Sequence, residues 1–248
     1  MIGTGIFTTT GIIADRLYTP FSLLLVWLVG GITALCGALC YAELSVAIPK
    51  SGGEYRYLSE IYHPSIGFLS AWISLLVGFS APIAATAVAF GEYLKHIIPF
   101  ISPKSAALSI VVFLSIIHTI DVRIGSYVQN FFTIIKVFIL LALVGAGFIY
   151  GSGAISLSPT KEDIHLITGA RFSESLIFVS FTYSGWNAAT YIAGEIKDPE
   201  KNLPASLISG VILVTILYML INTLYVYAVP IEEMAGKIEI GYLSAIKL

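Results

Sequence analysis

Charged residues are scarce in this sequence of 248 residues. They make up only 11% of it, whereas hydrophobic residues make up 57% and the mean hydropathy is +0.90. So few ionisable groups cannot cover the surface of a soluble globule of this length. The net charge is −2 and no Lys/Arg cluster occurs, which excludes a nucleic-acid partner and strong attraction to anionic lipid. The composition is typical of an integral membrane protein, whose surroundings are the lipid bilayer.

Residue types that build metal and catalytic sites are also rare. Cys36 and Cys40 lie four positions apart in an apolar stretch without zinc-type spacing, and we expect them to be small packing residues. The four histidines are scattered, so the sequence predicts no metal and no cofactor. The apolar stretches contain neither a nucleophile with a base nor rings of polar residues, which argues against an enzyme and against a channel. No cleavable signal peptide is recognisable.

Long uncharged stretches dominate the chain. A helix that rises about 1.5 Å per residue needs roughly 20 residues to cross about 30 Å of hydrocarbon. The sequence predicts a half helix over residues 1–14, then full helices, and an eighth helix that begins near residue 240. The full helices are expected near 21–48, 65–96, 104–119, 126–150, 172–195 and 203–228.

Most prolines, Pro204 among them, fall at the edges of these spans, where no interior hydrogen bond is lost. Pro82 is the exception and is expected to kink the third span, with Thr86 or a neighbouring helix satisfying the freed carbonyl.

Connecting segments hold most of the charge, as loops outside a bilayer do. Lys and Arg divide five against six between alternate loops, so the positive-inside rule does not orient this chain. We expect Glu43 and Glu195 to be solvated at the interface. Asp121 and Arg123 are interpreted as loop residues that pair as contacts of a cytoplasmic gate.

Two spans contain helix-breaking residues. Gly3 and Gly5 lie in the opening MIGTGIF, and Ser184 with Gly185 lies in the middle of the sixth span. The first pattern is not a dinucleotide fingerprint, because Thr8 stands where a third glycine or alanine is needed. An isolated glycine pair also suits close packing of another transmembrane helix. Two interruptions five spans apart favour the broken helices of inverted-repeat transporters over that alternative and over a purely structural membrane protein.

A helix broken in hydrocarbon exposes N–H and C=O groups, each of which costs several kcal/mol unless it is satisfied. The N-terminal end of a half helix suits a carboxylate, and unwound carbonyls suit an ammonium group. The two interruptions therefore predict a site for a zwitterion.

Three stretches carry a family resemblance: IGTGIF at 2–7, PKSGGEYRYL at 49–58 and FTYSGWNAATYIAGEIKDPEKNLPASL at 181–207. They resemble amino acid transporters of the APC superfamily, nearest to the L-type branch and its prokaryotic relatives, and the match runs through nearly the whole chain. The resemblance implies an all-α integral membrane protein with the LeuT-like inverted-repeat fold, in which helices 1 and 6 are broken. Residues 1–150 would form the first repeat (helices 1b to 5), 151–170 an extracellular loop, and 171–248 an incomplete second repeat of helices 6, 7 and the start of 8.

We expect a chain truncated at both ends. If Met1 were the true start, a charged amino terminus would lie beside the broken segment near the middle of the bilayer. Roughly 10 to 20 further residues are expected before Met1 to complete the first span. Several helices are expected after Leu248.

The resemblance also implies roles for the residues at the interruptions. Backbone N–H groups of Gly3, Thr4 and Gly5 would hold the substrate carboxylate, and carbonyls around Ile2, Phe181 and Ser184 would take its amino group. Phe181 would close over the substrate, while Trp186 and Asn187, after Gly185, would pack or hydrogen bond beneath it. Ser184 replaces the glycine usual in L-type members and narrows the site. Aromatic residues also serve as interfacial anchors, and we assign that role to Tyr191.

Lys136 interrupts the fifth span about ten residues from its start. An ammonium at that depth costs about 2.5 to 3.5 kcal/mol on insertion scales, so it needs a partner or a function. Snorkelling to the interface is the alternative. The resemblance places a lysine where sodium-driven relatives hold a sodium ion, tying the fifth helix to the first, and implies a coupling role.

The sequence thus predicts secondary transport or exchange of amino acids across the cell (plasma) membrane by alternating access, without a cofactor and without catalysis. A polyamine or other organic cation is the alternative substrate, but it favours an acidic residue facing the site, and the stretch 175–194 contains none. Nothing in the sequence indicates a partner subunit.

Overall fold

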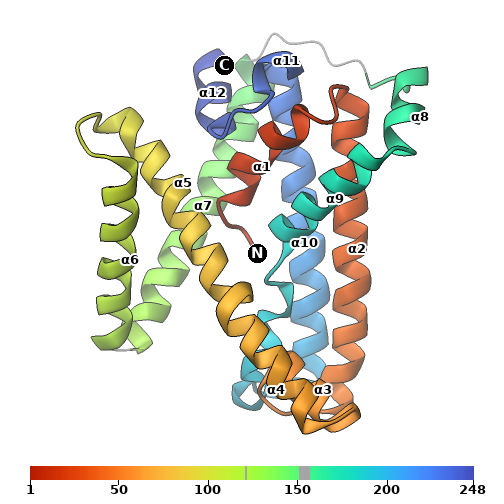
Figure 1. The fold of residues 1–248 in the computed structure, drawn as a ribbon, viewed down its shortest axis with the longest axis vertical. Helices are drawn as coiled ribbons and strands as arrows, with labels where there is room; N and C mark the ends of the chain where they lie inside the picture. Colours follow the sequence, from red (N-terminus) through yellow and green to blue (C-terminus); the bar gives the residue numbers. More distant parts are fainter. Residues whose placement is uncertain (121, 151–156) are drawn as a thin grey trace.

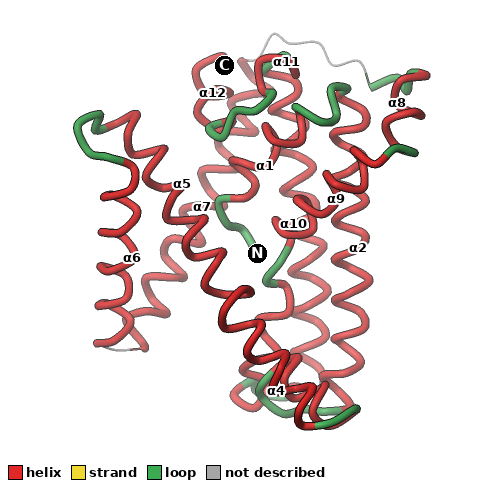
Figure 2. The backbone as a smooth tube through the Cα atoms, in the orientation of Figure 1, coloured by secondary structure: helices red, strands yellow, loops and turns green. Residues whose placement is uncertain are grey.

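The computed structural model describes residues 1–120, 122–150 and 157–248, and within these ranges the chain folds into helices joined by loops, without strands (Figure 2). Four helical stretches are long and apolar enough to cross a membrane: Pro20–Ala47, Pro64–Ile97, Tyr127–Tyr150 and Pro199–Ala228. The all-helical membrane class expected from the composition is confirmed. The pairing expected for Asp121 with Arg123 lies outside the described residues, as does the start of the expected loop, 151–156.

The centre of the molecule is the pair α2 (Pro20–Ala47) and α10 (Pro199–Ala228), which run side by side (Figure 1). Trp27 of α2 is fully buried, and its ring centroid lies 5.5 Å from that of Tyr218 in an edge-on arrangement. Gly31 allows this approach, because a Cβ there would lie 2.5 Å from the methyl group of Thr215. Close packing of this kind holds membrane helices together where lipid is as apolar as the side chains.

Two shorter helices flank this pair, namely α1 (Gly5–Ala14) and α9 (Ala170–Tyr183). Loops and short helices gather at both ends of the molecule (Figure 1). One end carries α8 (Lys161–Ile167), α11 (Ile231–Met234) and α12 (Ile240–Lys247), and the other end carries α3 (Gly53–Ile61). The α12 helix begins where we expected an eighth span to begin, and its eight residues contact α1 and α10.

A second group consists of α4 (Pro64–Ile73), η1 (Ser74–Phe79), α5 (Ser80–Ile97), α6 (Pro103–Ile120) and α7 (Val122–Tyr150). The α5 helix packs along α6 and leans away from it towards the other end of the molecule (Figure 1). Gly91 permits the contact, since a Cβ there would lie 2.2 Å from the Pro103 carbonyl oxygen.

The third span is distorted in the turn before Pro82, the proline expected to kink it. The wide π turn η1 comes directly before the turn that contains Pro82, and Ser80 Oγ donates to the Leu75 carbonyl at 2.7 Å. Thr86, expected to satisfy a carbonyl freed by Pro82, instead accepts from Thr4 Oγ1 at 3.4 Å. The π turn contains Gly78, four residues before Pro82, whose carbonyl loses its usual helical partner to the proline.

Other local expectations were wrong. Pro204 lies inside α10, because that helix begins five residues earlier at Pro199, directly after Asp198 with φ 47°. Cys36 and Cys40 are exposed rather than packed. The connecting segments expected as loops contain α3 and α8. Glu43 and Glu195 are exposed, as expected.

Asp163 fastens α8 to the start of α2. Its carboxylate accepts from the hydroxyls of Thr19 and Ser22 and from the backbone N–H and hydroxyl of Thr160, which caps α8. Burial by itself raises the pKa of the Asp163 carboxyl, but these hydrogen bonds outweigh it and hold that pKa well below its ordinary value.

Candidate functional site

The backbone is not helical at either of the two places where we expected an interruption. The first helix begins only at Gly5, after non-helical residues, and α9 ends at Tyr183. Ser184 is extended with φ −56° and ψ 159°, and Gly185 has a φ of 92°, a conformation that favours glycine. The chain then continues as the 3-10 helix η2 (Trp186–Glu195). The sixth span is therefore broken in its middle, as expected, and the residues before α1 are not helical.

The two interruptions lie side by side, although 180 residues separate them. A Cβ on Gly185 would lie 3.6 Å from the Met1 nitrogen. A Cβ on Gly5 would lie 2.7 Å from Thr182 Cγ2, so the start of α1 touches the end of α9. Figure 2 shows the loop at the N-terminus next to the loop that follows α9. Unpaired backbone groups of both breaks are thus gathered in one place.

Tyr218 of α10 joins the two interruptions, and sequence reasoning did not assign it. Its hydroxyl lies 3.0 Å from the Met1 carbonyl oxygen and 3.4 Å from the Thr182 carbonyl oxygen, so its single hydrogen is shared between these two acceptors. The side chain is fully buried. The sequence feature that could have identified Tyr218 is its place in the middle of an apolar span, because a buried hydroxyl there needs a hydrogen-bond partner.

Buried hydroxyl and amide groups connect α1 to its neighbours. Thr9 Oγ1 lies 3.0 Å from Thr182 Oγ1 on α9, and Thr10 Oγ1 donates to Asn222 Oδ1 on α10 at 2.6 Å. Asn222 Nδ2 in turn donates to the Tyr218 carbonyl at 2.8 Å. Every member of this set has a partner, so the contacts fix α1 against α9 and α10.

Lys136 of α7 points to the first interruption. Its Nζ donates to the Ile2 carbonyl oxygen at 3.0 Å, and the side chain is half-buried. The ammonium therefore finds its acceptor at the unwound segment, which argues against the snorkelling alternative. The contact joins the fifth span to the first, and the coupling role of Lys136 stays a prediction.

Several residues expected to bind substrate are exposed, and the start of α1 is uncapped. Gly3, Phe181, Ser184 and Gly185 are exposed, and no atom lies within 4 Å of a Cβ built on Gly3. The side chain of Thr4 does not cap α1, and the first turn of that helix carries no acidic residue. The positive end of α1 is thus left without a negative partner among the described side chains.

Trp186 and Asn187 are half-buried and contact other elements. The Trp186 ring meets Tyr41 of α2 edge-on, with centroids 4.9 Å apart, and Asn187 Nδ2 donates to Glu54 of α3. Tyr191 also donates to Glu54, and its expected role as an interfacial anchor stays a prediction. Sequence reasoning did not single out Glu54.

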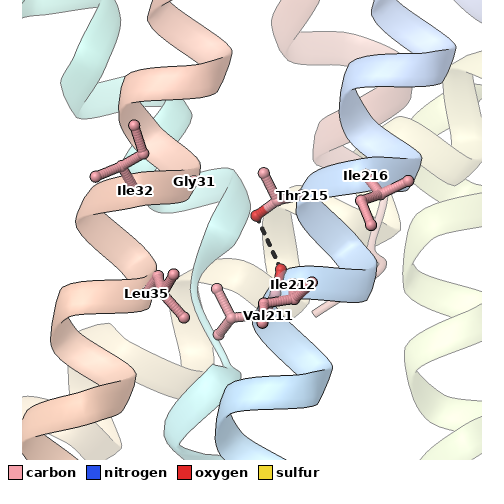
Figure 3. A pocket seen from close by; sticks show the side chains of 7 residues that line it. All are labelled: Gly31, Ile32, Leu35, Val211, Ile212, Thr215 and Ile216. Carbon is pink, nitrogen blue, oxygen red and sulfur yellow. Dashed lines mark hydrogen bonds between the residues drawn. The ribbon is translucent and has the colours of Figure 1, made fainter.

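An apolar pocket opens between α2 and α10, lined by Ile32, Leu35, Val211 and Ile212, among others (Figure 3). Thr215 Oγ1, its polar group, is already bonded to the Val211 carbonyl at 2.8 Å. No residue expected to bind substrate lines this pocket. Half-exposed isoleucines at its rim make it a lipid-facing depression rather than a site for a charged ligand.

Comparison with known proteins identifies relatives of the whole chain. The model of the amino acid permease family matches residues 1–247. The human b(0,+)-type amino acid transporter 1 is 34% identical over 245 residues, covering 94% of this chain and 50% of that protein. The mouse Asc-type amino acid transporter 1 is 33% identical over 244 residues, covering 94% of this chain and 46% of that protein. The serine/threonine exchanger SteT of Bacillus subtilis is 31% identical over 236 residues, covering 94% of this chain and 53% of that protein. The chain spans about half the length of these relatives.

Proposed function

The chain belongs to the amino acid permease family, and on that premise we propose that it forms part of a secondary transporter, which carries or exchanges amino acids across the plasma membrane by alternating access. Its four apolar spans and its family make it a membrane protein with several spans. The relatives named above are transporters or exchangers of amino acids by name, which supports the proposed substrate class. The observation that carries the proposal is the pair of helix interruptions that lie side by side.

A free amino acid matches the groups that these interruptions offer. Its carboxylate is proposed to bind the backbone N–H groups of Gly3, Thr4 and Gly5, at the uncapped positive end of α1. No side chain needs to move out of the way, because the amide end of the helix is open on the side of Gly3.

The amino group is proposed to bind carbonyl oxygens of both interruptions, those around Ile2, Phe181 and Ser184. The Phe181 carbonyl already accepts the Ser184 N–H at 3.1 Å, and the Ile2 carbonyl accepts Lys136 Nζ at 3.0 Å. Each oxygen keeps a second lone pair for an ammonium donor. The exposed Phe181 side chain is proposed to cover the bound substrate, with Trp186 and Asn187 beneath it.

Lys136 is proposed to take the structural place of a coupling cation. Its ammonium holds the Ile2 carbonyl to α7 without a bound sodium ion, so transport is expected to be independent of sodium. The bonds that fix α1 to α9 and α10 make these helices one unit, which suits the rigid-body rocking of alternating access.

Competition for uptake tests the proposal. The complete protein is reconstituted in proteoliposomes, and uptake of a labelled neutral amino acid is measured with unlabelled neutral, cationic and anionic amino acids and with polyamines as competitors. Inhibition by amino acids is expected. Inhibition by polyamines and by no amino acid would favour the organic-cation alternative and overturn the proposed substrate class.

A further inference from the structure

The segment Ser51–Glu54, which leads from α2 into α3, lies against η2. The Gly52 N–H donates to the Tyr191 carbonyl at 3.2 Å, and the Gly194 N–H donates to Ser51 Oγ at 2.9 Å. These bonds reach the second half of η2. A 3-10 helix has poorer internal hydrogen bonds than an α-helix, so contacts from outside contribute more to its position.

Two adjacent glycines make this approach possible. Gly52 and Gly53 have φ values of 126° and 53°, which L-residues with side chains rarely adopt. A Cβ on Gly53 would also lie 2.7 Å from the Tyr191 ring. The glycines therefore allow α3 to begin directly beside η2, and they place Glu54 in its first turn.

Glu54 collects three hydrogen bonds from two elements. Its Oε1 accepts from Asn187 Nδ2 and, at 3.2 Å, from the hydroxyl of Tyr41. Its Oε2 accepts from the hydroxyl of Tyr191. Asn187 and Tyr191 belong to η2, and Tyr41 belongs to α2. Hydrogen bonds to a carboxylate are roughly twice as strong as bonds between neutral groups, so this set is the strongest polar link described between α3 and η2.

The same carboxylate also supports Trp186, through Tyr41. The Tyr41 ring meets Trp186 edge-on at 4.9 Å between centroids, while its hydroxyl donates to Glu54. A Cβ on Gly37 of α2 would lie 2.8 Å from Trp186, so α2 closes the other side of that ring. Glu54 thus contacts Asn187 directly and is linked to Trp186 through one intervening residue, Tyr41.

We propose that Glu54 is a positioning residue for substrate binding, which holds Asn187 directly and Trp186 through Tyr41 in the places where they face the substrate. This inference rests on the proposed function, because it needs a substrate site at the two interruptions. A carboxylate suits this set because it is charged and accepts on both oxygens, and because Asn187 Nδ2 can only donate. An amide keeps one acceptor but loses the charge, and its NH₂ group forces one tyrosine hydroxyl to change from donor to acceptor. Asp is one methylene too short to reach all three partners.

Uptake kinetics of the complete protein in proteoliposomes give the first test. For Glu54→Gln we expect the KM for amino acid to rise about tenfold, the change that corresponds to loss of one charged hydrogen bond. Glu54→Asp is expected to behave in the same way. The control is Glu60→Gln, because Glu60 lies on the same helix and pairs with Lys50 and Arg56, both at 2.9 Å, away from η2. It should leave the KM unchanged.

A double-mutant comparison separates positioning from general destabilisation. If Glu54 acts through Asn187, then Glu54→Gln changes the KM of an Asn187→Ala variant far less than it changes that of the wild type. An equal rise in KM in both backgrounds would overturn the proposal. If Glu54→Gln does not fold, Tyr191→Phe removes one donor at constant size, and a KM unchanged by that variant would count equally against it.

Amide hydrogen exchange tests, without a transport assay, whether Glu54 positions η2. In Glu54→Gln we expect faster exchange in peptides covering 186–195, with no change in Glu60→Gln. Unchanged exchange in 186–195 overturns the proposal whatever the uptake shows. If the wild type transports no amino acid although exchange responds as expected, the proposed function fails while the hold of Glu54 on η2 stands.

Discussion

Replacement of Lys136 by Ala separates the role of this residue in transport from its role in stability. The variant removes the ammonium that donates to the Ile2 carbonyl at 3.0 Å. A hydrogen bond to a charged group contributes about 1.5–3 kcal/mol. The buried ammonium itself costs about 2.5–3.5 kcal/mol on insertion scales, a cost that the variant no longer has. These opposing terms nearly cancel, so the variant should insert and remain folded.

Uptake should fall although stability does not. The relief of the insertion cost stabilises the folded protein as a whole, but it does not replace the hydrogen bond that positions the Ile2 carbonyl at the proposed site. A loss of about 1.5–3 kcal/mol in the hold on the unwound segment corresponds to a fall in transport-competent molecules of about 10- to 140-fold. Uptake of labelled amino acid is measured in proteoliposomes with and without sodium, beside the melting temperature of the purified protein. Lys95→Ala, which changes an exposed lysine at the end of α5, is the matched control.

Two results would refute this reasoning. Unchanged, sodium-independent uptake by Lys136→Ala would show that the contact with Ile2 is not needed for transport. A large fall in melting temperature together with lost uptake would show that the cation is mainly structural. Lys136→Arg keeps the charge but changes its shape, and we expect partial uptake from it.

Two further predictions concern stability. Tyr218→Phe leaves the Met1 and Thr182 carbonyls without their shared donor at nearly constant volume, and we expect a destabilisation of about 1–3 kcal/mol in thermal melting, with full-length wild type as reference. Asp163→Asn weakens the link between α8 and α2. Because hydrogen bonds hold the folded pKa of Asp163 below the unfolded value of about 3.9, the ionised group stabilises the fold above about pH 4 and loses this contribution as the pH falls further. The melting temperature of wild type should therefore exceed that of the variant at pH 7 and approach it below pH 4; a gap that stays constant from pH 7 to pH 3 would contradict the assignment.

Much of the fold can be predicted from the sequence, because the bilayer imposes simple rules on it. Uncharged stretches of sufficient length become spans, and prolines such as Pro20 and Pro64 lie at the first residue of helices, where their missing N–H costs nothing. Glycines in the opening segment, and serine with glycine in the middle of the sixth span, predicted non-helical backbone at both places, because glycine has a low intrinsic helix propensity.

Predictions about the neighbours of individual residues were less successful. Pro204 was expected at a helix start and lies inside α10, because the helix can begin at another proline five residues earlier. The bond from Tyr191 to Glu54 was not predicted. In a membrane span both the lipid-facing and the protein-facing surfaces are apolar, so the pattern of hydropathy does not say which face is inside.

The sequence by itself determined that this is a helical membrane protein with two broken spans, since both properties depend on local composition and backbone preference. Only the tertiary structure decided that the breaks meet, that Tyr218 bridges them and that Glu54 holds η2. Those contacts join residues 217 and 133 positions apart in the cases of Tyr218 with Met1 and Glu54 with Asn187. Partners so distant in the chain are selected by helix packing and by the need of buried polar groups for a hydrogen bond, and no local pattern encodes either.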